Sequence, residues 1–280
     1  MSILVRRSGA FGDVLMTTPI VHRLREENPR DIIHVQTFHG YVYKDNPDVT
    51  SAWTVRNRQY YDREINLDLA YEKDMSLHQV DAYMRTAFSD EDGDKSIRLA
   101  KVPLPFWPDW SRTIVLHPAV SWPNRTLSQD WWQELGQRLH EMGYSVFSTG
   151  TMQDHKLRRP ITNLQGRLNL NQQAELIDKA LCFVASDSGP IQIVGATDTP
   201  LVGLFTITSG KRSVPYRHGE LGWNATIMDT TIPCGACREA LDEPVTYLEC
   251  KYGHNDCVRS FDIDQVVVAI TASIICDKRK

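Results

Sequence analysis

An aspartate close to the start of the chain is the first residue whose setting points to chemistry. The sequence opens MSILVRRSGAFGD, so a short apolar run leads into a glycine-containing loop that ends at Asp13. A carboxylate at the end of such a loop can act as a general base that takes the proton from a hydroxyl group. Asp13 could also cap a helix, and one residue can fill both roles. A dinucleotide-binding loop is disfavoured, because SGAFGD does not match GxGxxG.

A second group of residues could bind an anionic ligand. The stretch SDSGPIQ, residues 186–192, follows an apolar run and is expected to open a helix. Gly189 would let the backbone approach a ligand, Pro190 suits the first helical position, and N–H groups at a helix start favour an anion. The candidate phosphate-binding residues are Asp187, Ser188, Gly189, Pro190, Ile191 and Gln192.

Arg125 would add a full positive charge to that anion site. The simpler alternative is that Asp187 and Ser188 only cap the helix and that Arg125 is a surface cation. Trp122, in the same loop as Arg125, could touch a ligand or only pack.

Four of the six cysteines are close together near the C-terminus, and they could hold a metal ion. Their spacing is Cys-x2-Cys, then twelve residues, then Cys-x6-Cys, formed by Cys234, Cys237, Cys250 and Cys257. Four thiolates can close a tetrahedral zinc or iron site, which would be structural because no ligand position stays open. His254 is a possible substitute ligand. Reduced cysteines in a loop and a redox-labile disulfide are the alternatives.

The elements that position these residues point to an α/β protein. Short β-rich runs (ILV, IIHV, TIVLH, YSVFS, CFVAS, LVGLF and ATIM) alternate with longer amphipathic stretches, as expected for parallel sheets built from βαβ units. Residues 101–112 contain three prolines and two tryptophans and form the best candidate linker. We therefore expect two Rossmann-like domains facing across a cleft, with boundaries at 1–105 and 106–280.

Three local features make this expectation more specific. Pro19 should kink or delay the first turns of the helix that follows Asp13. A second helix should begin behind a Ser128 cap and stop at Gly143. Residues 62–88 should carry further helices, which belong to the first domain.

Composition sets limits on location and on partners. The chain has 280 residues, a net charge of −4 and an isoelectric point near 6.1, which argue against a broad electrostatic grip on nucleic acid. No charged-then-apolar leader opens the sequence, and its longest apolar stretch, VVVAITASIIC, is too short to span a bilayer. Cysteines without a signal peptide fit reduced thiols or metal ligands, so a cytoplasmic location is expected.

Taken together, these stretches resemble the ADP-heptose:lipopolysaccharide heptosyltransferases, glycosyltransferases of family 9 with the GT-B fold. RRSGAFGDVLMTTPIVHRLRE is similar to the family's N-terminal signature, whose GD aspartate is the proposed catalytic base; here that residue is Asp13. In HPAVSWPNRT, Ser121 and Arg125 fall at positions for a phosphate-contacting hydroxyl and a phosphate-binding cation. In STGTMQD, Asp154 falls at an acidic position that contacts the ribose.

The stretch SDSGPIQIVGATDTPLVGLF is similar to the family's Asp-Ser-Gly-Pro motif, and all four stretches stand in the family's order. The chain departs from the family at three points: Gln192 stands where the family often has His, Thr206 stands where it has a glycine, and the acceptor-side part of the N-terminal domain is short. The resemblance implies an inverting transfer of heptose from an ADP-sugar donor to an acceptor hydroxyl, with an acceptor-side N-terminal domain and a nucleotide-sugar-binding C-terminal domain.

The resemblance also implies that no catalytic metal is required, since a helix start and a guanidinium group can stabilise the leaving diphosphate. Some relatives that glycosylate proteins bind iron at a C-terminal cysteine cluster. The acceptor stays open: a glycan, a protein or a modified nucleobase, the last for a bacteriophage enzyme. An inactive nucleotide-binding scaffold is the remaining alternative, and the presence of both Asp13 and Asp187 argues against it.

Overall fold

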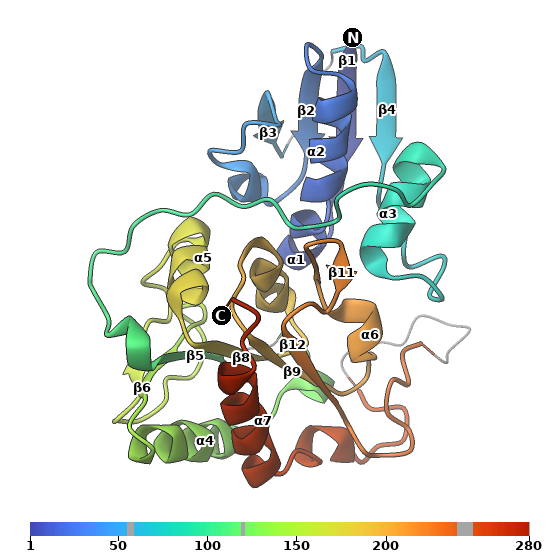
Figure 1. Cartoon of the computed structure of the whole chain (residues 1–280). Helices are drawn as coiled ribbons and strands as arrows, with labels where there is room; N and C mark the ends of the chain where they lie inside the picture. The colour runs from blue at the N-terminus through green and yellow to red at the C-terminus, as the bar shows by residue number, and fades with distance from the viewer. Residues whose placement is uncertain (55–58, 119–120, 240–248, 280) are drawn as a thin grey trace.

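The structure is a computed structural model that describes residues 1–54, 59–118, 121–239 and 249–279. It contains two parallel sheets, one above the other in Figure 1. The first sheet has the order β3-β2-β1-β4. Its strands are β1 (Ser2–Arg6), β2 (Ile32–Gln36), β3 (Ser51–Trp53) and β4 (Arg63–Asn66).

The second sheet has six parallel strands in the order β12-β9-β8-β5-β6-β7. Its strands are β5 (Thr113–His117), β6 (Ser145–Ser148), β7 (Thr162–Asn163), β8 (Cys182–Ser186), β9 (Leu201–Phe205) and β12 (Ala225–Asp229). A small antiparallel hairpin joins β10 (Tyr216–Arg217) to β11 (Glu220–Leu221). The α/β class and all seven strands expected from the apolar runs are confirmed.

Helices cover both faces of the second sheet. On one face α4 (Gln129–Glu141) and α7 (Ile263–Ile275) pack against alternate strand residues, around the buried Trp132. On the other face lie α5 (Leu170–Lys179) and the 3₁₀ helix η4 (Gly189–Ala196), between the two sheets in Figure 1. Four short helices also belong to this half of the described chain: α6 (Gly210–Ser213), η2 (Trp110–Arg112), η3 (Pro123–Arg125) and η5 (Asp256–Arg259).

The first sheet is flanked by α1 (Phe11–Leu15), α2 (Thr18–Glu27), α3 (Gln79–Phe88) and the short η1 (Gly40–Tyr43). The expected effect of Pro19 is confirmed, because the helical stretch is divided and Pro19 lies in the first turn of α2. Of the helices expected within residues 62–88, the structure contains one, α3. Residues Arg63–Asn66 form β4, whose only buried side chain is Ile65, and the helix begins only at Gln79.

The start and end expected for α4 are also confirmed. The Ser128 side chain accepts a hydrogen bond from the backbone N–H of Trp131, and Gly143, just after the helix, adopts φ +95°. Between α3 and η2, residues 89–109 contain no helix or strand and run along the outside of the molecule from the first sheet to the second (Figure 1).

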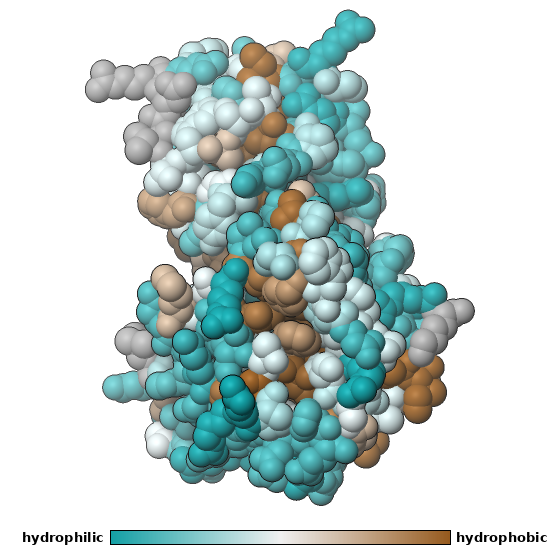
Figure 2. Space-filling view, turned by 90° about the vertical axis from the view of Figure 1, so that its left-hand side faces the viewer, coloured by the Kyte–Doolittle hydropathy of each residue, from teal (hydrophilic) through white to brown (hydrophobic). Residues whose placement is uncertain are grey.

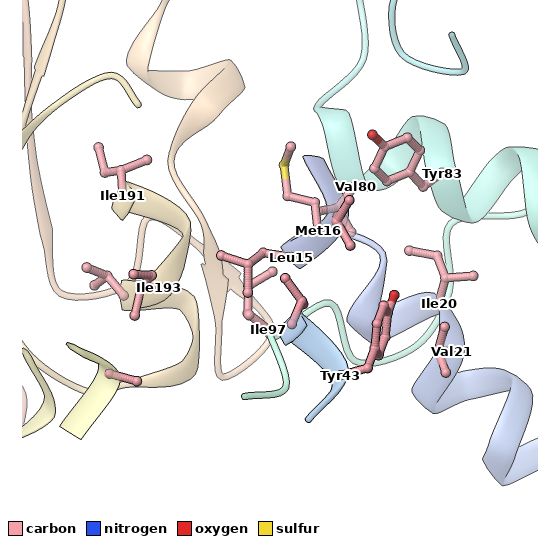
Figure 3. Packing of buried hydrophobic residues seen from close by; sticks show 14 of the residues in the cluster. Leu15, Met16, Ile20, Val21, Tyr43, Val80, Tyr83, Ile97, Ile191 and Ile193 are labelled. Carbon is pink, nitrogen blue, oxygen red and sulfur yellow. The ribbon is translucent and has the colours of Figure 1, made fainter. Parts of the chain in front are cut away.

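A continuous apolar cluster joins the two sheets. Leu15 and Met16 from the first half and Ile191 and Ile193 from η4 belong to the same buried cluster. Ile97, from the connecting segment, lies beside them (Figure 3). The surface in Figure 2 is mainly hydrophilic, and hydrophobic residues are visible in the middle of this face. Because the buried cluster packs the two halves against each other, the carboxyl ends of β1 and β8 lie close together.

Candidate active site

A cavity of about 180 Å³ lies where the loop after β1 meets the loop after β8. This position fits the general rule that ligands of open α/β sheets bind beyond the carboxyl ends of parallel strands. Most of the residues predicted from sequence line it, namely Asp13, Ser121, Arg125, Asp187, Ser188, Gly189 and Gln192. Trp122 also lines the cavity. Pro190 and Ile191 are buried behind it, and Ile191 belongs to the apolar core.

Asp13 is fixed by three hydrogen-bonding groups. Its Oδ1 accepts a hydrogen bond from the Tyr71 hydroxyl at 2.9 Å, and its Oδ2 accepts one from the Ala10 backbone N–H at 2.9 Å. The Arg7 guanidinium lies 3.2 Å from Oδ2. Asp13 thus takes part in the cap of α1 from inside its first turn, while its side chain remains 18% exposed at the cavity. It is both oriented and accessible, as a general base must be.

Arg7 and Tyr71 were not found by sequence reasoning. Arg7 is nearly fully buried and also contacts Glu72 at 2.7 Å, so it holds two carboxylates in place. Burial, and then the negative charge of Asp13, raise the pKa of Tyr71 well above its ordinary value. The hydroxyl therefore stays protonated and keeps donating to Asp13.

Arg125 is held by the residues around it. Its Nη1 lies 3.3 Å from both the backbone oxygen and the Oδ2 of Asp187, and its Nη2 donates to the Thr208 hydroxyl at 3.0 Å. Its guanidinium carbon lies 4.1 Å from the centre of the Trp122 ring. The prediction of a surface cation is therefore not supported, and a phosphate bound here would share Arg125 with Asp187.

The helix that opens at the Asp-Ser-Gly-Pro motif is a 3₁₀ helix, η4, with Pro190 in its first turn. Ser188 is the residue before it and does not cap it, because the Ser188 hydroxyl donates to the Ser186 carbonyl at 3.1 Å. The simple capping alternative for Ser188 is therefore wrong. Ser188 and Gly189, where η4 begins, line the cavity. Pro190 has no N–H group, and the Ile191 N–H donates to the Ser188 carbonyl at 3.0 Å.

Two glycines bring α1 and η4 into close contact. A Cβ atom added to Gly12 would lie 2.7 Å from the Gly189 Cα, and one added to Gly189 would lie 2.5 Å from the Phe11 ring. The two motif glycines are thus required for packing between the halves of the molecule. The distance between Asp13 and the start of η4 depends on this contact.

Asp154 lies apart from the other predicted residues. It lines a separate cavity of about 290 Å³ together with Pro118, Leu127 and Trp132. Its carboxylate accepts hydrogen bonds from the backbone N–H and the hydroxyl of Thr151, so it also shapes its own loop. The ribose contact at Asp154 stays a prediction.

The four clustered cysteines line one small cavity, together with Asn124, Ile207 and Arg238. Cys234 Sγ also lies 3.9 Å from His254 Nε2. Burial favours a higher pKa for Cys250, but backbone N–H groups of residues 252–255 outweigh it and lower that pKa. Within the described ranges, however, no group of three or more His, Cys, Asp or Glu side chains is arranged to hold a metal ion. The metal stays a prediction.

Arg238 is a third residue that sequence reasoning missed. It directly follows Cys237, yet it lines the Asp13 cavity as well as the cysteine cavity. Its guanidinium carbon lies 5.1 Å from the centre of the Trp122 ring. The cysteine cluster and the candidate active site are therefore neighbours.

In the part of the chain that the structure describes, no helix is both long and apolar enough to cross a membrane.

Among proteins of known function, lipooligosaccharide heptosyltransferase 2 of Haemophilus influenzae is 30% identical over 110 residues, 35% of this chain and 30% of that protein. Lipopolysaccharide heptosyltransferase 3 of Escherichia coli is 21% identical over 275 residues, 70% of this chain and 81% of that protein. The matched region spans about a third of the length of the first of these relatives.

Solved structures share the fold over nearly the whole chain. The ADP-heptose heptosyltransferase II of E. coli has a TM-score of 0.74 at 17% identity and covers 99% of this chain and 100% of that chain. The iron-containing dodecameric glycosyltransferase TibC of enterotoxigenic E. coli has a TM-score of 0.75 at 15% identity, covering 97% of this chain and 78% of that chain. The fold is therefore GT-B. The sequence model of glycosyltransferase family 9 (heptosyltransferase) matches residues 50–247, more than half of the sequence, and this chain belongs to that family.

Proposed function

We propose that this protein is an inverting glycosyltransferase that moves heptose from an ADP-linked donor to an acceptor hydroxyl group. The observation that carries the proposal is that Asp13, a base candidate, lines the same cavity as Arg125 and the start of η4, an anion site. Membership of family 9 supports the class of reaction. The retained base and anion site argue against an inactive scaffold.

The transfer is an in-line displacement at the anomeric carbon. Asp13 takes the proton of the acceptor hydroxyl group while the oxygen of that hydroxyl forms the new bond to the anomeric carbon. The bond between the anomeric carbon and the diphosphate oxygen breaks, and ADP leaves with the electron pair. Arg125 and the backbone of Ser188 and Gly189, where η4 begins, stabilise the departing diphosphate. These groups can do the electrostatic work of a metal ion, so the proposal includes no catalytic metal.

Related proteins support the choice of substrates. TibC has been solved with ADP-D-β-D-heptose, which supports ADP-heptose as the donor. The relatives named above are lipopolysaccharide or lipooligosaccharide heptosyltransferases, which favours a glycan acceptor. A protein or a modified nucleobase is the second possibility for the acceptor. We place the reaction in the cytoplasm, where the six thiols would stay reduced.

The proposal is tested by incubating the protein with ADP-heptose and a panel of acceptors, and by following both ADP release and product mass. A glycan, protein or nucleoside product heavier by one heptose confirms transfer and identifies the acceptor class. Absence of ADP binding, together with absence of ADP release from every mixture, contradicts the proposal.

Replacing Arg125 with Ala should weaken ADP binding by about tenfold or more and change adenosine binding by less than about twofold, because a guanidinium bonds phosphate and not the nucleoside. Isothermal calorimetry with both ligands measures the difference. Arg30 is exposed and does not line the cavity, so Arg30→Ala, which removes the same charge, supplies a matched control. Equal weakening of ADP and adenosine in Arg125→Ala would show that Arg125 has a structural role only.

The predicted metal at the cysteine cluster is structural, so no step of the transfer is assigned to it. Purified protein should contain about one zinc or iron ion per chain. Cys237→Ser should lose that metal and unfold at a lower temperature. Cys276→Ser changes an exposed cysteine outside the cluster and should keep the metal and the wild-type unfolding temperature. Elemental analysis and thermal unfolding provide the measurements. Metal-free wild-type protein with four alkylatable thiols in the cluster would disprove the site.

A further inference from the structure

The turn that carries Cys234 and Cys237 is attached to the sheet that forms the anion site. We call residues 232–239 the cysteine turn. The Ala236 and Arg238 backbone N–H groups donate to the carbonyls of Thr206 and Ile207, at 2.9 and 3.0 Å, just after β9 ends. Glu239 accepts a hydrogen bond from the Ser209 N–H at 2.6 Å. The cysteine turn is therefore anchored beside the loop after β8 that holds Asp187.

This anchoring places the Arg238 side chain inside the candidate active site. Arg238 is only 9% exposed, yet it lines the cavity that Asp13 and Arg125 also line. Both arginines lie against Trp122, at 4.1 and 5.1 Å from the ring centre. One aromatic side chain thus contacts both guanidinium groups.

The charges around the cavity show what a second guanidinium would add. Asp187 lies 3.3 Å from Arg125, so part of the charge of Arg125 is already balanced within the protein. A departing nucleoside diphosphate gains negative charge on its terminal phosphate, so a second cation in the cavity would add to the stabilisation that Arg125 supplies. Arg238 lines the same cavity as Tyr71, and its positive charge opposes the larger rise that burial causes in the pKa of Tyr71.

We propose that Arg238 is a second cation of the donor diphosphate site, supplied by the cysteine turn, and that it stabilises the leaving diphosphate together with Arg125. This assignment rests on the proposed function. An arginine suits the role because its planar fork can bind two phosphate oxygens at once, whereas a lysine at the same position would act as a single point charge. Burial against Trp122 limits the rotamers of Arg238 before the donor arrives.

The test compares the affinities of ADP, AMP and adenosine in wild-type protein, Arg238→Gln and Arg238→Lys by calorimetry. We expect Arg238→Gln to weaken ADP by about tenfold or more, AMP by less, and adenosine by less than about twofold. Arg238→Lys should recover part of the ADP affinity, because it restores the charge and retains the aliphatic packing on Trp122. Lys251→Gln removes an exposed cation near Cys250 and serves as the control, with all three affinities unchanged.

Two results would overturn the assignment. Unchanged ADP affinity in Arg238→Gln would show that Arg238 does not contact the diphosphate, and equal losses for ADP and adenosine would show that it only supports the fold. Failure of the proposed function gives a different result, because wild-type protein would then bind no ADP at all. In that case the Arg238 assignment is contradicted along with it.

Discussion

Replacing Asp13 with Asn is expected to lower the rate of sugar transfer by at least about a hundredfold, because the amide cannot take the proton of the acceptor hydroxyl. The fold should survive the change. The amide oxygen can still accept from the Ala10 N–H, its NH₂ group can donate to the Tyr71 hydroxyl, and Arg7 keeps its contact with Glu72. We expect the free energy of unfolding to fall by no more than about 2 kcal/mol, and ADP affinity to stay unchanged.

Initial rates with ADP-heptose, ADP titration and thermal unfolding together separate these effects. Asp68→Asn is the matched control, since Asp68 accepts hydrogen bonds from Ser8 in the same loop and does not line the cavity. Its transfer rate should remain within a few-fold of wild type. If Asp13→Asn turned over as fast as wild-type protein, Asp13 would have no part in the mechanism.

Gly12→Ala should have the second largest effect, through the contact between α1 and η4. The new methyl group would lie 2.7 Å from the Gly189 Cα. The methyl group is fixed to the backbone of α1 and its neighbour is a backbone atom, so α1 or η4 must move. Overpacking of this kind costs about 1–3 kcal/mol of folding free energy. Because the movement separates Asp13 from the start of η4, we also expect about a hundredfold loss of transfer rate, as for misplaced catalytic groups in general.

Gly40→Ala is a suitable control for this change. A methyl group on Gly40 would lie 3.4 Å from the Ala52 carbonyl oxygen, an ordinary contact, and Gly40 has no positive φ. The unfolding temperature and the initial transfer rate of Gly40→Ala should both remain close to those of wild-type protein. If Gly12→Ala unfolded at the wild-type temperature and transferred sugar at the wild-type rate, α1 and η4 would be able to shift without cost, and their contact would not determine the geometry of the site.

The elements that the sequence predicted correctly are those with strong local signals. The seven apolar runs became strands because their apolar side chains pack into the clusters on the faces of the parallel sheets, fully buried in most strands and partly buried in β12. The short strands β3, β4 and β7 contain no such apolar run. Residues Arg63–Asn66 are ordered by pairing with β1, which is 57 or more residues away in the chain, and local periodicity does not report that pairing.

The candidate site shows the same division. Asp13, Arg125 and the Asp-Ser-Gly-Pro stretch were identified because each lies in a motif that follows a strand, and the structure brings them to one cavity. Tyr71 and Arg238 come from irregular segments, and only tertiary packing places them beside those motifs. Asp154 shows the reverse, since its motif was recognised but its side chain faces another cavity.

The apolar cluster that runs between the two sheets has a consequence for how the molecule unfolds. Leu15, Ile97 and Ile193 belong to one buried cluster, and Ile97 packs closely against Gly195. Separating the halves would expose this cluster to water, so neither half can lose its structure without destabilising the other. The chain should therefore denature as one cooperative unit, and its backbone amides in β1 and β8 should exchange with solvent through the same global opening. A fragment that ends after α3 would lack the other side of its own core.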